Sequence, residues 1–159
     1  MRTQGSRARS QRGMTLVELI VAFTILAYLT TLAVPLARYR VQRDKERDLV
    51  YALRTMHKAI DDYKDAALAG KIQVKLGTDG YPEKLEDLVN GVDMVQSAEK
   101  KKIKFLRRIP IDPMTGTTDW GLRSTQDDPT STSWGGQNVF SVYTKSTDRA
   151  RDGTLYSTW

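Results

Sequence analysis

The sequence predicts an α+β fold in which one long N-terminal helix carries a small C-terminal domain of short helices and a small antiparallel β-sheet. Three observations predict it. Residues 14–36 are mostly apolar with a single charge, Glu18, and residues 37–69 continue with an amphipathic helical pattern. The chain after Pro110 changes to turn and strand residues. We therefore expect one helix whose front half is apolar throughout and whose back half packs on the domain.

The segment 14–36 has the length and composition of a membrane-spanning helix. Its 23 residues correspond to about 34 Å of helix, enough to cross a bilayer. A basic leader, residues 1–13, precedes it with four arginines and no acid. We expect a single pass through a membrane with the N-terminus in the cytoplasm, because a short first flank usually stays there. A conventional signal cleavage after Ala33 is an alternative, which the nearby Pro35 disfavours.

Length, charge and cysteine content limit the possible functions. After the leader and the apolar segment, residues 37–159 form one domain, expected in the periplasm or outside the cell. The net charge of +6 falls to +2 without the leader, because 21 basic residues then face 19 acidic ones. The basic excess thus belongs to targeting, and we expect no nucleic-acid partner. The absence of cysteine excludes disulfides and zinc-thiolate sites.

The back half of the helix has an apolar stripe that the domain must cover. Its residues recur at helical spacing, with alanines beside them: Leu49, Ala52, Leu53, Met56, Ala59, Ile60, Tyr63, Ala66 and Ala67. The opposite face is charged, and Lys58 can meet Asp61 or Asp62 one turn on. Gly70 is expected to end the helix.

The remaining elements are predicted to be short. Pro82 is expected at a helix start, followed by an amphipathic segment at 85–89 that Asn90-Gly91 closes. Residues 94–106 are readable as a further short helix with solvated lysines. The other expected elements are a turn at 112–116, strands at 118–123 and 139–144, a polar loop at 124–138 and a last short strand at 155–159.

The string from Arg12 to Leu19, RGMTLVEL, strongly resembles the class III signal of type IV pilin-like proteins. In that family a prepilin peptidase cuts after the glycine and methylates the new N-terminus, and a glutamate fifth in the mature chain guides assembly. The resemblance implies a cut between Gly13 and Met14, methylation of Met14, and an assembly role for Glu18. Methionine replaces the usual phenylalanine as first mature residue. Pro35 falls where many members have a proline that kinks the helix.

Later motifs resemble the major (G-type) pseudopilin of type II secretion systems: Tyr81-Pro82, Leu85, Leu88, Phe105-Leu106, Ile109-Pro110, Asp112-Pro113 and Gly116. This resemblance implies a type IV pilin-like fold and a non-enzymatic subunit that polymerises through its N-terminal helices to drive protein export. The implied partners are prepilin peptidase, an inner-membrane assembly platform and minor pseudopilins. The implied filament is periplasmic or on the cell surface.

Three other functions are alternatives to the major pseudopilin. The first is a minor pilin or adhesin that binds a ligand through loop 124–138. The second is a type IV pilus subunit, and the third is a signal-anchored periplasmic protein that never polymerises. A major subunit should form the bulk of a sheared filament, whereas a tip protein should be a trace.

Glu18 and Pro35 are the candidate assembly residues. A carboxylate inside a membrane span costs roughly 2.5–3.5 kcal/mol, so we expect Glu18 to pair with the free amine of Met14 on a neighbouring subunit. The alternative is that Glu18 reaches the lipid headgroups. Pro35 removes an N–H group and crowds the carbonyl of Thr31, and the hydroxyls of Thr30 and Thr31 are expected to satisfy the freed groups. We expect a kink there rather than a helix exit.

Asp148 and Asp152 are candidate calcium ligands, because calcium prefers six to eight oxygen ligands. The resemblance implies a calcium site near the C-terminus, although Arg149 and Arg151 add positive charge beside it. The alternative is a solvated turn in which the arginines pair with the aspartates.

The remaining residues that can carry chemistry do not form a catalytic set. His57 stands alone, and Lys100 to Lys104 are expected to be a solvated face rather than a nucleic-acid contact. Trp120, Trp134 and Trp159 are expected in the core or at the sheet edge. No nucleophile with a base and an orienting residue is found, so the sequence does not predict an enzyme.

Overall fold

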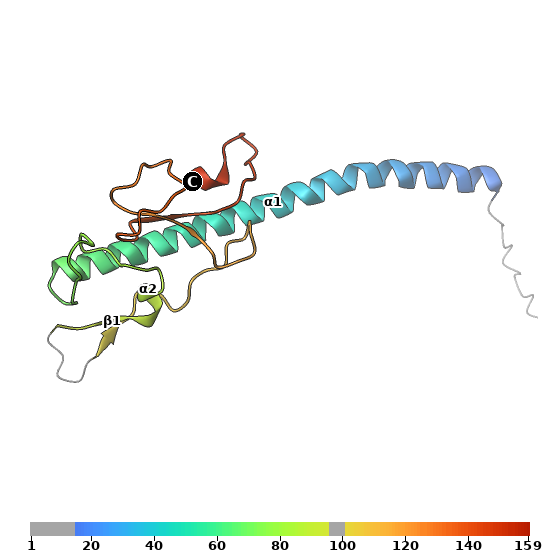
Figure 1. Cartoon of the computed structure of the whole chain (residues 1–159). Helices are drawn as coiled ribbons and strands as arrows, with labels where there is room; N and C mark the ends of the chain where they lie inside the picture. Colours follow the sequence, from blue (N-terminus) through green and yellow to red (C-terminus); the bar gives the residue numbers. More distant parts are fainter. Residues whose placement is uncertain (1–14, 96–100) are drawn as a thin grey trace, which may run out of the picture. The chain divides into compact units, whose positions relative to one another are not determined.

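The computed structural model describes residues 15–95 and 101–159, with the backbone alone for residues 32–37. The chain divides into two units, residues 1–42 and 43–159. Helix α1, Leu16–Leu68, is continuous over 53 residues and contributes to both (Figure 1). It agrees with the long helix predicted from the sequence. The short elements that follow it confirm the predicted α+β class.

The first unit contains the start of α1. Thr15 caps the helix, because its Oγ1 accepts the N–H of Glu18 at 3.3 Å and its carbonyl accepts the N–H of Leu19 at 3.1 Å. Thr15 and Glu18 have the spacing of a capping box, in which a Thr at the N-cap precedes a Glu by three positions. The pair therefore fixes where the helix begins.

The second unit contains the back half of α1, whose predicted stripe is buried. Leu49, Met56 and Ile60 are at most 1% exposed, and Ala52, Leu53, Ala59 and Tyr63 are also buried. The helix ends as predicted at Gly70, which has a φ of +65°. The N–H of Lys71 then donates to the carbonyl of Ala66 at 3.0 Å, the six-to-one bond of a Schellman motif.

The first small sheet pairs β1, Val92–Asp93, with β2, Lys102–Ile103, in antiparallel register, Val92 opposite Ile103. The reading of 94–106 as a helix is therefore wrong for the described residues 101–106; residues 96–100 lie outside the description. The backbone is extended here because it has partners outside the segment. The N–H groups of Phe105 and Leu106 both donate to the carbonyl of Leu88 at 2.9 Å.

Helix α2, Asp87–Asn90, is shorter and later than predicted. Pro82 does not start it, because the carbonyl of Pro82 accepts the N–H of Val139 at 2.8 Å and so joins the chain to the second sheet. The N–H of Gly91 closes α2 on the carbonyl of Asp87, in agreement with the predicted end. Leu88 is fully buried and anchors the helix in the core.

The second small sheet pairs β3, Gly121–Arg123, with β4, Ser141–Tyr143, and Leu122 lies opposite Val142. Both strands lie inside the predicted ranges and are shorter. A Cβ on Gly121 would come within 2.5 Å of three atoms of the Tyr143 ring, so only glycine fits beneath that ring. The position requires glycine because of this close approach.

The C-terminal segment forms a 3₁₀ helix, η1, Tyr156–Thr158, where a strand was predicted. Leu155 alone makes a bridge, with Arg149. The chain then turns, because the N–H groups of Thr158 and Trp159 donate back to Leu155 and Tyr156. The turn buries Tyr156 against the core and stacks Trp159 edge-on to it, with 5.1 Å between ring centroids.

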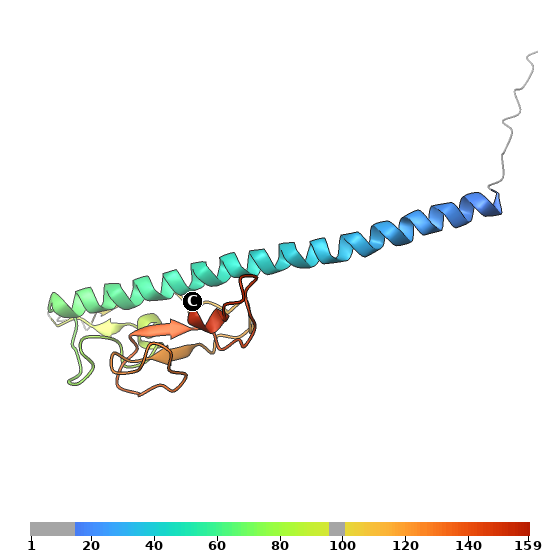
Figure 2. The ribbon, with the colours of Figure 1, turned by 90° about the horizontal axis from the view of Figure 1, so that it is seen from above.

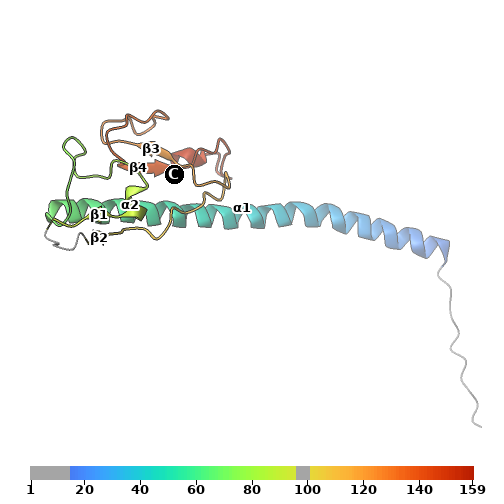
Figure 3. The same cartoon turned by 60° about the horizontal axis from the view of Figure 1, so that its bottom comes forward.

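One core joins these elements within the second unit. Figures 2 and 3 show both sheets and η1 alongside the back half of α1. The buried cluster takes residues from every part of the unit, among them Leu49, Met56, Ile72, Leu88, Leu106, Trp120, Val139, Val142 and Tyr156. Trp120 is buried as expected, and its Nε1–H donates to the carbonyl of Pro110.

Candidate functional site

Glu18 lies in the first turn of α1, where a negative charge interacts favourably with the helix dipole. It is exposed, and its carboxylate has no hydrogen bond or ion pair with any residue that the structure describes. Gly13 and Met14, the predicted cleavage and methylation positions, lie outside the described residues. The pairing of Glu18 with the Met14 amine of a neighbour therefore stays a prediction.

α1 continues through position 35 without interruption. The expected role of the threonine hydroxyls is wrong. Thr30 donates to the carbonyl of Leu26 and Thr31 to that of Tyr28, each at 2.7 Å. Each hydroxyl therefore bonds to a carbonyl one turn earlier in the helix, and neither donates to the carbonyl of Thr31.

Apolar side chains surround the described front of α1 on all sides. Ten of them are 40–75% exposed within the single chain: Leu16, Val17, Leu19, Ile20, Val21, Phe23, Ile25, Leu26, Tyr28 and Leu29. A helix that is apolar all round is normally buried in a large core or in a membrane. An exposed apolar surface of this extent marks a site of interaction.

In the part of the chain that the structure describes, no helix reaches the length and apolar content needed to cross a membrane. Met14 and the side chains of residues 32–37, which belong to the expected span 14–36, lie outside that part.

The C-terminal loop that contains Asp148 and Asp152 is closed by its own hydrogen bonds. Asp152 Oδ1 accepts the backbone N–H and the hydroxyl of Thr154, at 2.9 and 2.7 Å. These bonds lower the pKa of Asp152 below its usual value. Arg149 donates to the carbonyl of Gly153 at 2.8 Å rather than to an aspartate.

This geometry does not fit a calcium ion. No group of three or more histidine, aspartate or glutamate side chains that could hold a metal occurs among the described residues. Calcium needs six to eight oxygens, but one carboxylate oxygen of Asp152 already accepts two hydrogen bonds and the Gly153 carbonyl faces a guanidinium. We therefore derive no role through calcium.

His57 connects α1 to β4. Its Nε2 lies 3.1 Å from Ser141 Oγ and accepts the N–H of Val142 at 3.5 Å. Burial lowers the pKa of His57 below its usual value, and the charge of Asp61 opposes that shift. The imidazole thus makes a structural contact between α1 and β4, and it belongs to no group of three or more metal-ligating side chains in the described chain.

Asp112 is a buried carboxylate that the sequence analysis treated only as part of a turn. It is 0% exposed, and its oxygens accept the N–H of Met114 at 2.8 Å and the hydroxyls of Thr115 and Thr144 at 3.1 and 2.5 Å. It ties the predicted turn at 112–116 to the end of β4. The Asp-Pro-Met-Thr sequence carried this signal, since an aspartate opening a turn commonly accepts from the N–H two residues on.

Residues 8–34 match the family model described as the Prokaryotic N-terminal methylation motif. No curated protein and no solved structure matches the chain. The matched range contains Gly13, Met14 and Glu18. The match supports a type IV pilin-like subunit, a class of structural proteins whose precursors carry this prepilin signal. It covers the N-terminal segment and does not extend to the domain.

Proposed function

We propose that this chain is the major pseudopilin of a type II secretion system, made as a membrane-anchored precursor and polymerised into a filament that drives protein export. Prepilin peptidase removes residues 1–13 and methylates Met14. The apolar segment 14–36 then leaves lipid and packs against copies of itself, while residues 37–159 form the outer layer of the filament. The observation that carries this proposal is the methylation motif at 8–34.

The front of α1 supports the polymerisation step. Its apolar side chains are exposed in the single chain, so their burial must come from lipid or from other chains. Exchanging lipid contacts for helix contacts has little hydrophobic driving force, so packing and polar pairing decide it. Glu18 supplies the polar pair once cleavage creates the amine of Met14, and this couples processing to assembly.

Intact-mass spectrometry of the protein purified from a host with prepilin peptidase tests the processing step. The proposal predicts loss of residues 1–13 and the added mass of one methyl group. A Gly13→Ala variant is the control and should keep its leader. A wild-type chain that keeps residues 1–13 in such a host contradicts the proposal.

Deletion of the gene tests the secretion role. The proposal predicts that exported enzymes then accumulate in the periplasm and that the wild-type gene restores their release. Unchanged export together with loss of surface filaments would instead favour the type IV pilus alternative.

A minor, ligand-binding subunit is the second candidate, because loop 124–138 is preformed. Asp127 Oδ2 accepts the backbone N–H groups of Ser124 and Gly135, at 2.7 and 3.0 Å, and these bonds lower the pKa of Asp127. Buried Asn138 anchors the other end through Thr78 and Thr125. Quantifying the chain in sheared filaments separates the candidates: the bulk of the material indicates a major subunit and a trace indicates a tip protein.

A further inference from the structure

The exposed face of α1 in the second unit is divided by charge. Arg43, Arg47 and Arg54 lie toward its start, and Asp61 and Asp65 toward its end; all five are exposed. At 100° per residue they fall on one stripe, opposite the buried stripe of Leu49, Met56 and Ile60. The helix therefore presents arginines and aspartates to the same side at different heights.

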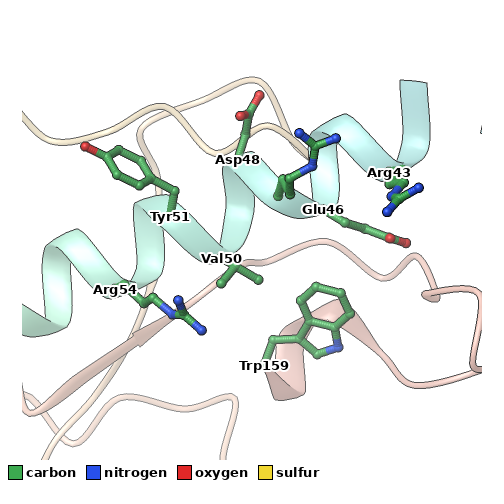
Figure 4. A pocket seen from close by; sticks show the side chains of 8 residues that line it. Arg43, Glu46, Asp48, Val50, Tyr51, Arg54 and Trp159 are labelled. Atoms are coloured by element: carbon green, nitrogen blue, oxygen red, sulfur yellow. The ribbon is translucent and has the colours of Figure 1, made fainter. Parts of the chain in front are cut away.

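The arginines border a hollow of about 640 Å³ lined by Arg43, Glu46, Arg47, Asp48, Val50, Tyr51, Arg54 and Trp159. Figure 4 shows Val50 and Arg54 directed from α1 toward Trp159. Tyr51 is 75% exposed at its edge. Arginine, tyrosine and tryptophan are the residues most enriched at the energetic centres of protein interfaces.

Three charged groups on this stripe make no hydrogen bond or ion pair with the residues that the structure describes. The guanidinium of Arg43 has no hydrogen bond or ion pair with any residue that the structure describes, and the same holds for the carboxylates of Asp61 and Asp65. Lys58 contacts Asp62 instead, at 2.9 and 3.0 Å. Arg47 makes one exposed pair with Asp44 at 3.1 Å, and such a pair exchanges readily.

The two charged pairs have the same spacing. Arg43 and Arg47 are four residues apart, as are Asp61 and Asp65, and each aspartate follows its arginine by 18 residues. Eighteen residues are five full turns, or about 27 Å along the helix, so the pairs also share one direction around it. A parallel second copy displaced by that distance brings both aspartates opposite both arginines.

We infer that the hollow at Arg43 and Arg47 is a docking site for the Asp61–Asp65 turn of a second copy of this chain. This inference rests on the proposed function, since it specifies a contact within the homopolymer. The contact is head-to-tail, because the arginine pair of one copy meets the aspartate pair of the other. Exposed ion pairs are individually weak, so the contact sets the register between subunits while the front of α1 provides the affinity.

Cysteine cross-linking tests the contact, because the chain has no cysteine of its own. A full-length R47C/D65C variant keeps the Arg43–Asp61 pair to hold the register. Treated with a short bis-maleimide, its filaments should give a ladder of covalent oligomers. The two cysteines of one chain are about 27 Å apart, beyond the reach of the reagent, so each link joins two chains.

The matched control is D44C/D62C, which has the same 18-residue offset but lies about 100° around the helix from Arg43 and Asp61. A ladder with R47C/D65C that is at least tenfold stronger than with D44C/D62C supports the docking site. Filaments that form normally but give no ladder, or equal ladders, overturn it and leave the proposed function intact. A chain that keeps its leader and forms no filament overturns the proposed function, and the same comparison on the concentrated dispersed chain then decides the docking site.

Charge exchange provides a second readout. Arg43→Asp should lower filament yield several-fold, and adding Asp61→Arg to the same chain should restore it, because the swapped charges attract again. A double variant that is no better than Arg43→Asp alone contradicts the pairing.

Discussion

The two halves of α1 are both rich in apolar side chains but expose them very differently. Leu26 in the front half is 59% exposed, whereas Leu49 in the back half is 0% exposed. In the back half the apolar residues form one stripe, which the strands and loops of the same chain cover. In the front half they occupy every side of the helix. Folding of the single chain therefore buries the apolar side chains of the back half, whereas those of the front half need lipid or other copies to bury them.

Glu18→Ala should have the largest effect, because it should prevent the front half of α1 from assembling into filaments. Removing the carboxylate leaves the new amine of Met14 without its proposed partner, so we expect filaments to disappear while cleavage continues. Sheared filament yield and the intact mass of the cellular protein measure the two steps. Glu86→Ala, which removes an exposed acid of the second unit outside α1, is the control and should still give filaments. Normal filament yield from Glu18→Ala would contradict the pairing.

A matched pair of leucine substitutions tests the burial contrast directly. Leu49→Ala should lower the free energy of unfolding by about 2–5 kcal/mol, because it opens a cavity in the core. Leu26→Ala should change it by less than about 0.5 kcal/mol, since an exposed side chain contributes little to folding of a single chain. Urea denaturation of the detergent-solubilised chain measures both. Equal losses would mean that the front half also belongs to the folded core.

Gly121→Ala tests how closely the second sheet packs on itself. The new methyl would collide with the Tyr143 ring, so we expect a loss of about 1–3 kcal/mol in the free energy of unfolding. Gly135→Ala is an informative comparison, because its nearest atoms are the ends of the Gln137 and Asp127 side chains rather than an aromatic ring. Thermal denaturation of the two variants should show the larger fall for Gly121→Ala.

The His57 contact predicts a modest acid sensitivity of the second unit. Because burial lowers the pKa of His57 in the folded chain, the unfolded chain binds the proton first as the pH falls below about 6.5. Stability should be flat above that pH and should fall as the pH drops through the folded value. Urea midpoints between pH 7.5 and 5 measure it, and His57→Gln should flatten the slope. An unchanged slope would assign the acid sensitivity to other groups.

Calcium should have the smallest effect. The closed geometry around Asp152 and Arg149 predicts no change in Tm between millimolar calcium and EDTA. A rise in Tm that Asp148→Asn abolishes would restore the calcium site that the sequence indicated.

The periodicity of apolar residues predicted the long helix and its buried stripe better than it predicted the short elements of the domain. The stripe from Leu49 to Tyr63 and the cap at Gly70 follow from local spacing and conformation, so they could be predicted from the sequence. The segment around Phe105 could not, because its extended backbone depends on a carbonyl of α2 that is distant in sequence. Leu155 to Trp159 was misassigned for the same reason, since burial of Tyr156 decides its turn.

For the candidate sites too, features set by local sequence could be predicted, whereas features set by contacts distant in sequence could not. Glu18 could be proposed as an assembly residue because it is a lone charge at a fixed distance from Gly13, and its role stays a prediction. The calcium site at Asp148 and Asp152 stays a prediction, because composition does not reveal that Thr154 and Arg149 donate to oxygens of this loop. The hollow beside Arg43 and Arg47 was missed because Trp159, which forms its wall, comes from the other end of the chain.

Solvent labelling of a single cysteine at position 26 tests the central claim most directly, namely that the front of α1 is buried by copies of itself. Leu26→Cys filaments, sheared and free of detergent, should react with a polar maleimide at least tenfold more slowly than filaments of Asp128→Cys, whose residue lies on an exposed loop. Denatured samples of both should react equally. Equal labelling of the two positions in intact filaments would contradict the account.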